Sequence, residues 1–217
     1  MLRNRDCMGR PREKSNNQKE RTAMTEKIPP RRLGFDIDGV VADTAGAFIR
    51  LARDQYGLGE IDPAEITAFQ VEDCLDIPPR KVEEIFGHLL TDPIGHGLEA
   101  MPNAIEVLNE LAATAPLTFI TARPQHRPIK EWLEAKLAPH AAKTMRLVAM
   151  GEHDGKGEHI RKMGLQYFID DRAETCIRLA AEGLSPYVYN QPWNRGRHRL
   201  PAVDNWLAIR DLCAVAA

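Results

Sequence analysis

Residues 33–44 read LGFDIDGVVADT, and their apolar start followed by acids predicts a buried strand that runs into a loop. Asp36 and Asp38 stand one residue apart where the chain leaves that strand, and Gly39 opens the loop. A carboxylate at a strand tip can act as a metal ligand or a nucleophile, and a second acid two residues on can reach a leaving group. A polar strand end, in which both acids cap backbone amides, remains the alternative from this stretch alone.

Strand-like and helix-like segments alternate along the rest of the chain. This alternation predicts an α/β fold, with helices on both faces of a parallel sheet in three layers. After Thr44, a plausible N-cap, a helix is predicted that Gly57 and Gly59 end. The predicted segments that follow are a helical region over 61–97 with its clearest helix at 80–90, helices after Pro102, over 129–137, over 156–163 and over 173–180, and strands at 117–121, 145–150, 167–171 and 187–190.

Several polar residues fall at the predicted carboxyl ends of strands, where parallel sheets bind ligands. Asp170 and Asp171 end a second strand, so up to four acids converge with Asp36 and Asp38. Their mutual repulsion is relieved by a divalent ion, and oxygen-only ligands favour Mg²⁺ over zinc.

Two further polar residues are candidates for binding phosphate. Thr121 offers a hydroxyl and a loop amide at a strand end, and Lys156 offers a fixed charge between Gly155 and Gly157. Taken singly, a structural threonine and a solvated surface lysine are the more common readings of such residues. The segment 151–157 has the wrong spacing for a P-loop, Gly95-His96-Gly97 is too short for a dinucleotide fingerprint, and the valines after Gly39 exclude an EF-hand loop.

Charge divides the chain into a basic start and an acidic remainder. The first 32 residues hold ten Lys and Arg against four Asp and Glu, and the rest holds nineteen against twenty-seven. An acidic body argues against binding of a nucleic-acid polymer but allows a small anionic substrate. Residues 1–31 are predicted to be disordered, and Met24 is an alternative start of translation.

The cellular location and the state of the cysteines are predicted from targeting signals, apolar runs and cysteine spacing. We find no hydrophobic signal core and no run of transmembrane length, so a soluble, cytoplasmic protein without membrane partners is expected, with a mitochondrial-type presequence as the lesser alternative. The four cysteines, Cys7, Cys74, Cys176 and Cys213, have no metal or redox spacing and are expected to be free.

Four motifs in order carry a family resemblance: DIDGV at 36–40, ITAR at 120–123, Lys156, and IDD at 169–171. From about Leu33 to Asn190 the chain resembles the haloacid dehalogenase superfamily. The resemblance implies a Rossmann-like core and an Mg²⁺ cofactor. It also implies these roles: Asp36 as nucleophile, Asp38 as general acid/base, Thr121, Ala122, Arg123 and Lys156 as phosphate binders, and Asp36, the Asp38 carbonyl, Asp170 and Asp171 as metal ligands.

The second acid of the first motif narrows the reaction class. Superfamily dehalogenases lack an acid at the position of Asp38, and the P-type ion pumps carry threonine there, so phosphomonoester hydrolysis through an aspartyl-phosphate is favoured. The resemblance divides the chain into a core, 32–44 and 100–217, and a small helical cap inserted after the first strand, 45–99. Candidates to face the substrate are Phe48, Tyr56, Phe69 and His88.

Within the superfamily, FDIDGVVADT, FITARP and VYNQPWNR are similar to the pyrimidine 5′-deoxynucleotidase group. This resemblance implies a phosphorylated metabolite, with nucleotides as candidates. Trp193 and Arg195 follow the last predicted strand at the same sheet edge, and the alternatives for them are stacking on a base, ordering the site, or packing the last helix. The chain departs from the group at Thr-Ala-Arg, where those enzymes have Thr-Ser-Pro, so the substrate stays open. Alternatives are a non-catalytic protein that binds a phosphorylated metabolite, and a phosphotransferase; the oligomeric state is not predicted.

Overall fold

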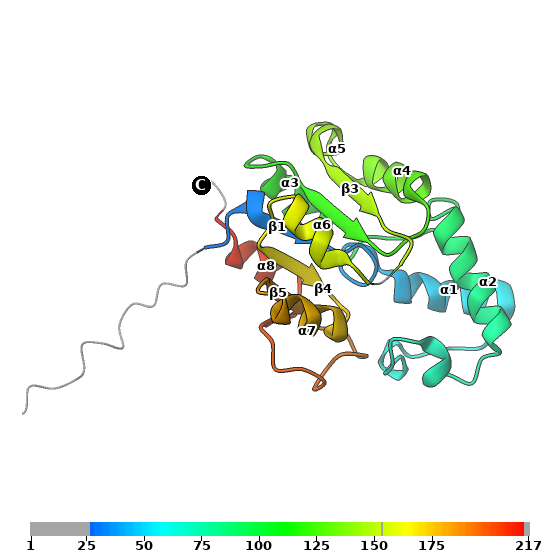
Figure 1. Cartoon of the computed structure of the whole chain (residues 1–217). Helices are drawn as coiled ribbons and strands as arrows, with labels where there is room; N and C mark the ends of the chain where they lie inside the picture. Colours follow the sequence, from blue (N-terminus) through cyan, green and yellow to red (C-terminus); the bar gives the residue numbers. More distant parts are fainter. Residues whose placement is uncertain (1–26, 153, 215–217) are drawn as a thin grey trace, which may run out of the picture.

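The computed structural model describes residues 27–152 and 154–214. Six parallel strands form one sheet in the order β3-β2-β1-β4-β5-β6 (Figure 1). Phe35 of β1 is aligned with Phe119 of β2 on one side and Ile169 of β4 on the other. The strands are β1 Leu33–Phe35, β2 Thr118–Thr121, β3 Arg146–Ala149, β4 Tyr167–Asp170, β5 Ser185–Tyr189 and β6 Ala202–Val203.

Helices cover both faces of this sheet, which confirms the predicted three-layer α/β fold. In Figure 1, α6 and α7 lie in front of the sheet, and α3 and α8 lie behind it. A small apolar cluster around Phe168 and Ile160 fills one face, and a larger one around Phe35 and Trp206 fills the other. The α-helices are α1 Thr44–Tyr56, α2 Pro79–Thr91, α3 Ala104–Ala112, α4 His126–Lys136, α5 Pro139–Thr144, α6 Lys156–Lys162, α7 Ala173–Ala181 and α8 Trp206–Leu212.

Strand order reverses beside β1. The chain moves outward from β1 to β2 and β3, and then returns to add β4, β5 and β6 on the other side. Ligands of open parallel sheets bind beyond the carboxyl ends of the strands at such a reversal. The residues that follow β1 and β4 are therefore expected to form the site.

Residues 45–99, which we call the helical segment, contribute no strand to the sheet. They hold most of α1, the short 3-10 helices Pro63–Glu65 and Val71–Asp73, and α2. Phe48 and Phe86 stack at 5.0 Å between ring centroids and join the two long helices. Figure 1 shows the segment beside the sheet, toward the ends of β1 and β4. Its role as a cap domain remains a prediction.

Two local predictions differ from the structure. The N-cap of α1 is Asp43, whose Oδ1 accepts the Gly46 N–H at 2.9 Å, and Thr44 is the first helical residue. Ile28 is buried and pairs with Cys213, and residues 30–32 form a 3-10 helix, so the predicted disorder is wrong for residues 27–31. Residues 1–26 of that extension, with Cys7 and Met24, lie outside the described residues.

Two findings bear on the remaining predictions. The described cysteines, Cys74, Cys176 and Cys213, are free thiols, as expected. Among the described residues, no helix has the length and apolar character needed to cross a membrane.

Helix α5 and strand β6 had not been predicted, because each is short and lacks a periodic apolar pattern.

Candidate active site

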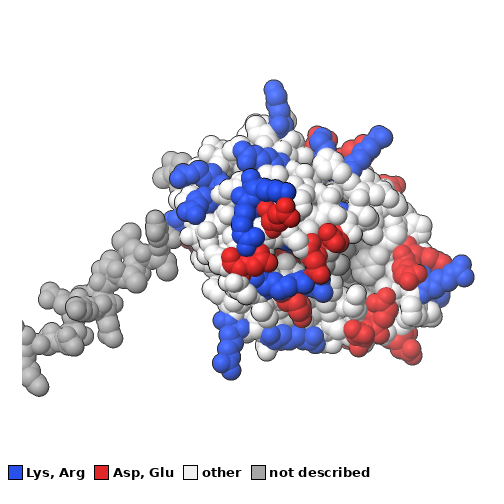
Figure 2. Space-filling model, in the orientation of Figure 1, with Lys and Arg blue, Asp and Glu red and all other residues white. Residues whose placement is uncertain are grey.

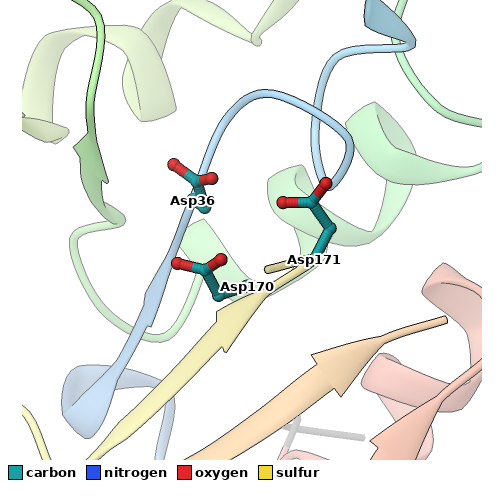
Figure 3. A group of neighbouring side chains, drawn as sticks. All are labelled: Asp36, Asp170 and Asp171. Carbon is teal, nitrogen blue, oxygen red and sulfur yellow. The ribbon is translucent and has the colours of Figure 1, made fainter. Parts of the chain in front are cut away.

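Three buried aspartates meet where β1 and β4 end. Asp36 follows β1 directly, and its N–H donates to Ile169 O of β4 at 2.8 Å. Asp170 is the last residue of β4, and Asp171 comes next. One carboxylate oxygen from each of the three lies within 4.8 Å of the others. Figure 3 shows the three side chains gathered at the tips of the two strands.

Lys156 joins two of these acids. It is the first residue of α6, and its side chain is 4% exposed. Its Nζ donates to Asp170 Oδ2 at 2.6 Å and lies 3.0 Å from Asp36 Oδ1. Burial by itself lowers the pKa of Lys156, but the charges of Asp170 and Asp36 outweigh it and raise that pKa, so the amine stays charged.

The cluster carries more negative than positive charge. Three carboxylates face one ammonium, so the full ionic state has an excess of two negative charges. Burial, followed by the neighbouring Asp170 and Asp38, raises the pKa of Asp36 from 3.8 to about 7 against the opposing effect of Lys156. Burial and the same neighbouring charges raise the pKa of Asp171 well above its usual value. For these two acids, the charge of Lys156 thus offsets burial and the neighbouring carboxylates only in part.

The donor set fits a divalent cation of the Mg²⁺ type. All three side chains are carboxylates, and they share a single ammonium, that of Lys156. A hard cation with oxygen ligands would supply the positive charge that the cluster lacks. Asp36, Asp170 and Asp171 are therefore the residues that could hold the ion through their side chains.

Asp38 is held apart from this cluster by different partners. Arg123 donates from Nε to Asp38 Oδ2 at 2.9 Å and from Nη2 to Asp38 Oδ1 at 2.7 Å. The hydroxyl of Thr44 donates to Oδ1 at 2.6 Å. Burial tends to raise the pKa of Asp38, but Arg123 and these hydrogen bonds outweigh burial and lower that pKa. Asp36 and Asp38 thus have pKa values shifted in opposite directions.

The loop after β2 presents Thr121 and Ala122 to the same space. Thr121 is buried, and its Oγ1 accepts the Arg123 N–H at 3.2 Å, which fixes the turn that follows the strand. The structure therefore brings together every residue for which the sequence predicted a role in catalysis, phosphate binding or metal binding.

A loop after β5 positions Asp171. The Nε1–H of Trp193 donates to Asp171 Oδ2 at 3.0 Å, and Asn194 donates to the Asp171 carbonyl at 2.6 Å. Gln191 donates to the Gly39 carbonyl at 2.7 Å, and Gly39 has a φ of +70°. A Cβ on Gly39 would lie 2.4 Å from Asp171 Oδ2, so the turn requires glycine.

A cavity of about 400 Å³ opens above these residues. Its floor holds the aspartates, Thr121 and Lys156, and its roof comes from the helical segment. The roof residues are mostly apolar: Ala45, Phe48, Ile66, Phe69, Gln70, Val71, Phe86 and Leu90. Arg172 stands at the side, with its guanidinium carbon 4.8 Å from the centre of the Phe69 ring.

The comparison with protein families identifies the chain. Residues 31–217 match the model of the 5′ nucleotidase, deoxy (pyrimidine), cytosolic type C proteins. The chain belongs to this nucleotidase family. The match confirms the predicted membership of the haloacid dehalogenase superfamily and the prediction of a phosphatase-type enzyme. No curated protein matches the chain.

Solved structures similar to this nucleotidase-family chain share its fold at low identity. A protein assigned as a phosphoglycolate phosphatase from Lactobacillus plantarum has a TM-score of 0.57 and 16% identity, and the match covers 85% of this chain and 100% of that one. A haloacid dehalogenase-like hydrolase from Streptococcus pneumoniae has a TM-score of 0.56 and 12% identity, covering 82% and 95%. Both confirm the Rossmann-like core.

Not every residue expected near the substrate lies there. Phe48 and Phe69 line the cavity, but Tyr56 and His88 do not, so that expectation is wrong for these two residues. The centroids of the Tyr56 and His88 rings are 6.5 Å apart, because both residues lie where α1 packs on α2. Arg195 is exposed and does not line the cavity, whereas its neighbour Trp193 does.

Three residues of this nucleotidase-family site were missed from the sequence. Gln191 and Asn194 had no role assigned, although they stand in the quoted VYNQPWNR stretch beside Trp193. Thr44 had been taken for a helix cap, and its hydroxyl instead binds Asp38. The only indication in the sequence for these three residues was a polar side chain close to a motif acid or a strand end. Such positions are too common to predict a site residue by themselves.

Proposed function

We propose that this nucleotidase-family chain is a magnesium-dependent phosphomonoester hydrolase that forms an aspartyl-phosphate on Asp36. The observation that carries the proposal is the cluster of Asp36, Asp170 and Asp171, with Lys156 between two of its members. Excess negative charge in a buried site has no structural benefit, but it suits an enzyme that must hold a cation and a phosphate together.

The proposed reaction has two steps in which Asp36 and Asp38 divide the work. Asp36 attacks phosphorus, the bond to the ester oxygen breaks, and Asp38 gives its proton to the departing oxygen. Since Arg123 favours the ionised form of Asp38, that proton comes with the singly protonated phosphate of the substrate. Asp38 then removes a proton from water, which attacks the aspartyl-phosphate and releases inorganic phosphate and free Asp36.

The remaining floor residues bind the phosphoryl group. In this proposal Lys156 pairs with the phosphoryl oxygens, and its charge favours the ionised form of Asp36. Thr121 and Ala122 border the same space with a hydroxyl and loop amides. When bound, Mg²⁺ supplies positive charge that stabilises the phosphoryl oxygens. In phosphoryl transfer, positioning and electrostatic stabilisation of this kind carry most of the catalysis.

The roof suggests what the phosphate is attached to. Its side chains are apolar or aromatic apart from the amide of Gln70, and no charged residue of the helical segment lines the cavity. A leaving group that is uncharged and partly planar fits such a roof, and the base of a nucleotide meets this description. The family to which the chain belongs is named for 5′ nucleotidases, so nucleoside monophosphates are our first substrate class. The helical segment is then the cap that excludes water.

Partners and location follow from the same proposal. Figure 2 shows basic and acidic side chains interspersed on one face rather than gathered into a basic stripe, as expected for a protein that binds a small metabolite and not a nucleic-acid polymer. The free thiols of the described cysteines suit a reducing compartment, so we place the protein in the cytoplasm.

The test is release of phosphate from a panel of nucleotides, sugar phosphates and small phosphorylated acids, with and without Mg²⁺. Wild-type protein should release phosphate only with the metal, and Asp36→Asn should reduce turnover by a factor of at least about 10⁴ while the fold persists. Acid quenching should trap a labelled phosphoenzyme on wild type. Turnover by the variant would refute Asp36 as nucleophile, binding without turnover would indicate a non-catalytic protein, and phosphate release only through an acceptor would indicate a phosphotransferase.

A further inference from the structure

We propose that Arg123 is a positioning residue that orients Asp38 and ties its carboxylate to the helical segment, rather than a ligand of the substrate phosphate. The inference rests on the proposed hydrolase function and assigns a role within it. It differs from the role that the sequence motif implied for Arg123, which was phosphate binding.

Every nitrogen of the Arg123 guanidinium donates to a protein oxygen. Nε and Nη2 form a two-pronged pair with the Asp38 carboxylate, and Nη1 donates to the Leu89 carbonyl at 2.9 Å. The Arg123 side chain is only 2% exposed, whereas that of Asp38 is 33% exposed. Paired, buried hydrogen bonds of this kind are strong and geometrically specific. A phosphate oxygen would have to compete with them, and Arg123 therefore serves Asp38.

The bond to Leu89 has a cause in the sequence. Leu89 lies in the last turn of α2, where its carbonyl would normally accept the N–H of the residue four positions on. That residue is Pro93, which has no N–H, so the helix leaves the carbonyl without its usual partner. Arg123 supplies the missing donor, and its positive charge also suits the negative end of the helix. The contact is thus a helix cap made by a residue of the core.

Both partners of Asp38 lead to the helical segment. Thr44 opens α1 at the entrance to that segment, and Arg123 reaches the last turn of α2 near its exit. The carboxylate of Asp38 is held between these two points. A displacement of the helical segment relative to the sheet would alter the position of Leu89, then of Arg123, and then of Asp38.

Orientation matters for the step assigned to Asp38. A general acid must lie within hydrogen-bond reach of the oxygen that leaves, and a misplacement of about 1 Å can cost about a hundredfold in rate. Arginine fixes both carboxylate oxygens at once, which a lysine or an amide does not. Loss of Arg123 should consequently impair the transfer of a proton to the leaving group and leave the attack on phosphorus largely intact.

The experiment compares phenyl phosphate with p-nitrophenyl phosphate, whose leaving group needs little protonation. Values of kcat/KM, which report steps up to ester cleavage, are measured for wild type, Arg123→Gln, Asp38→Asn and the double variant. Arg123→Gln should lose about 10- to 100-fold on phenyl phosphate and less than about threefold on p-nitrophenyl phosphate. In the Asp38→Asn background the same substitution should change either value by less than about twofold, because Arg123 acts through Asp38.

Matched variants keep the result interpretable. Arg127→Gln removes an exposed arginine that pairs with Glu131 on α4, and it should change neither ester. If Arg123→Gln does not fold, the cycle is run with Arg123→Lys, which keeps the charge and loses the two-pronged geometry.

Two results would overturn the inference. Equal losses on both esters would show that Arg123 binds the phosphate, and a further loss in the Asp38→Asn background would show that it acts independently of Asp38. Failure of the hydrolase proposal is distinguishable, because the wild-type protein would then release no phosphate from any phosphomonoester and the role of Arg123 would fall with it.

Discussion

Replacement of Asp36 by asparagine is expected to stabilise the metal-free protein at pH 8, although it removes the proposed nucleophile. The Asp36 side chain is 10% exposed and shares one lysine with Asp170, beside the further charge of Asp171. Without a cation, an ionised Asp36 is therefore repelled by its neighbours and poorly hydrated. Asparagine keeps the shape of the side chain and removes the charge.

The magnitude follows from the pKa of Asp36, which is about 7 in the fold against 3.8 for the ordinary group. A raised acid pKa means that the folded state binds more protons than the unfolded state between these two values. The contribution of Asp36 to stability therefore falls as pH rises from about 4 to 7. The full difference corresponds to about 4 kcal/mol, and relaxation of the site makes about 2 kcal/mol a reasonable lower figure.

The assay is urea unfolding in a chelator at pH 5 and pH 8, with wild type, Asp36→Asn and Asp76→Asn compared. Asp76 is exposed and serves as the control for loss of a surface acid. The advantage of Asp36→Asn should be large at pH 8 and small at pH 5. Mg²⁺ should reduce it at pH 8, because binding of the proposed metal should stabilise wild type by about 2.7 kcal/mol at a hundred times the dissociation constant. A variant less stable than wild type at pH 8 without metal would refute the reasoning.

Three more predictions concern the acids of the cluster and their supports. Gly57 has a positive φ similar to that of Gly39 but open space around it, so Gly57→Ala should cost about 1–2 kcal/mol of stability and Gly39→Ala more, as urea unfolding would show. Only Gly39→Ala should also weaken Mg²⁺ binding, as measured by calorimetry. Trp193→Phe keeps an aromatic ring but loses the hydrogen bond to Asp171, so calorimetry should show Mg²⁺ binding about tenfold weaker; unchanged affinity would contradict this role. Lys156→Met leaves the acids without their cation, so apparent phosphate affinity should fall by at least about tenfold, as phosphate inhibition would show.

The sheet and its acidic edge could be predicted from the sequence because both depend on local patterns. The run LGFDID places an acid at a strand end whatever the partners of that strand, and the pair Asp170 and Asp171 does the same for β4. Parallel strands share an edge, so the meeting of these acids follows from the fold class. The helix boundaries were predicted less well: Thr44 was predicted as the N-cap of α1, and the structure has Asp43 in that position.

The orientation of side chains could not be predicted, because it depends on contacts between distant segments. Tyr56 and Phe48 lie on the same helix, yet only Phe48 reaches the cavity, and the packing of α1 on α2 decides which. The resemblance implied phosphate binding for Arg123, but its side chain turns to Asp38 and Leu89. The sequence shows neither partner, since they are 85 and 34 residues away.

The opposite pKa shifts of Asp36 and Asp38 follow from these distant contacts. The two acids leave the same strand one residue apart, so local sequence does not distinguish their titration. Asp36 turns into the acidic cluster, where its pKa rises, and Asp38 turns to Arg123 and Thr44, where its pKa falls. When the surroundings of two neighbouring acids shift their pKa values in opposite directions, the two acids can take different roles in an active site. In this chain Asp36 lies among Lys156, Asp170 and Asp171. Asp38 is instead held by Arg123, which is anchored to the Leu89 carbonyl at the end of α2.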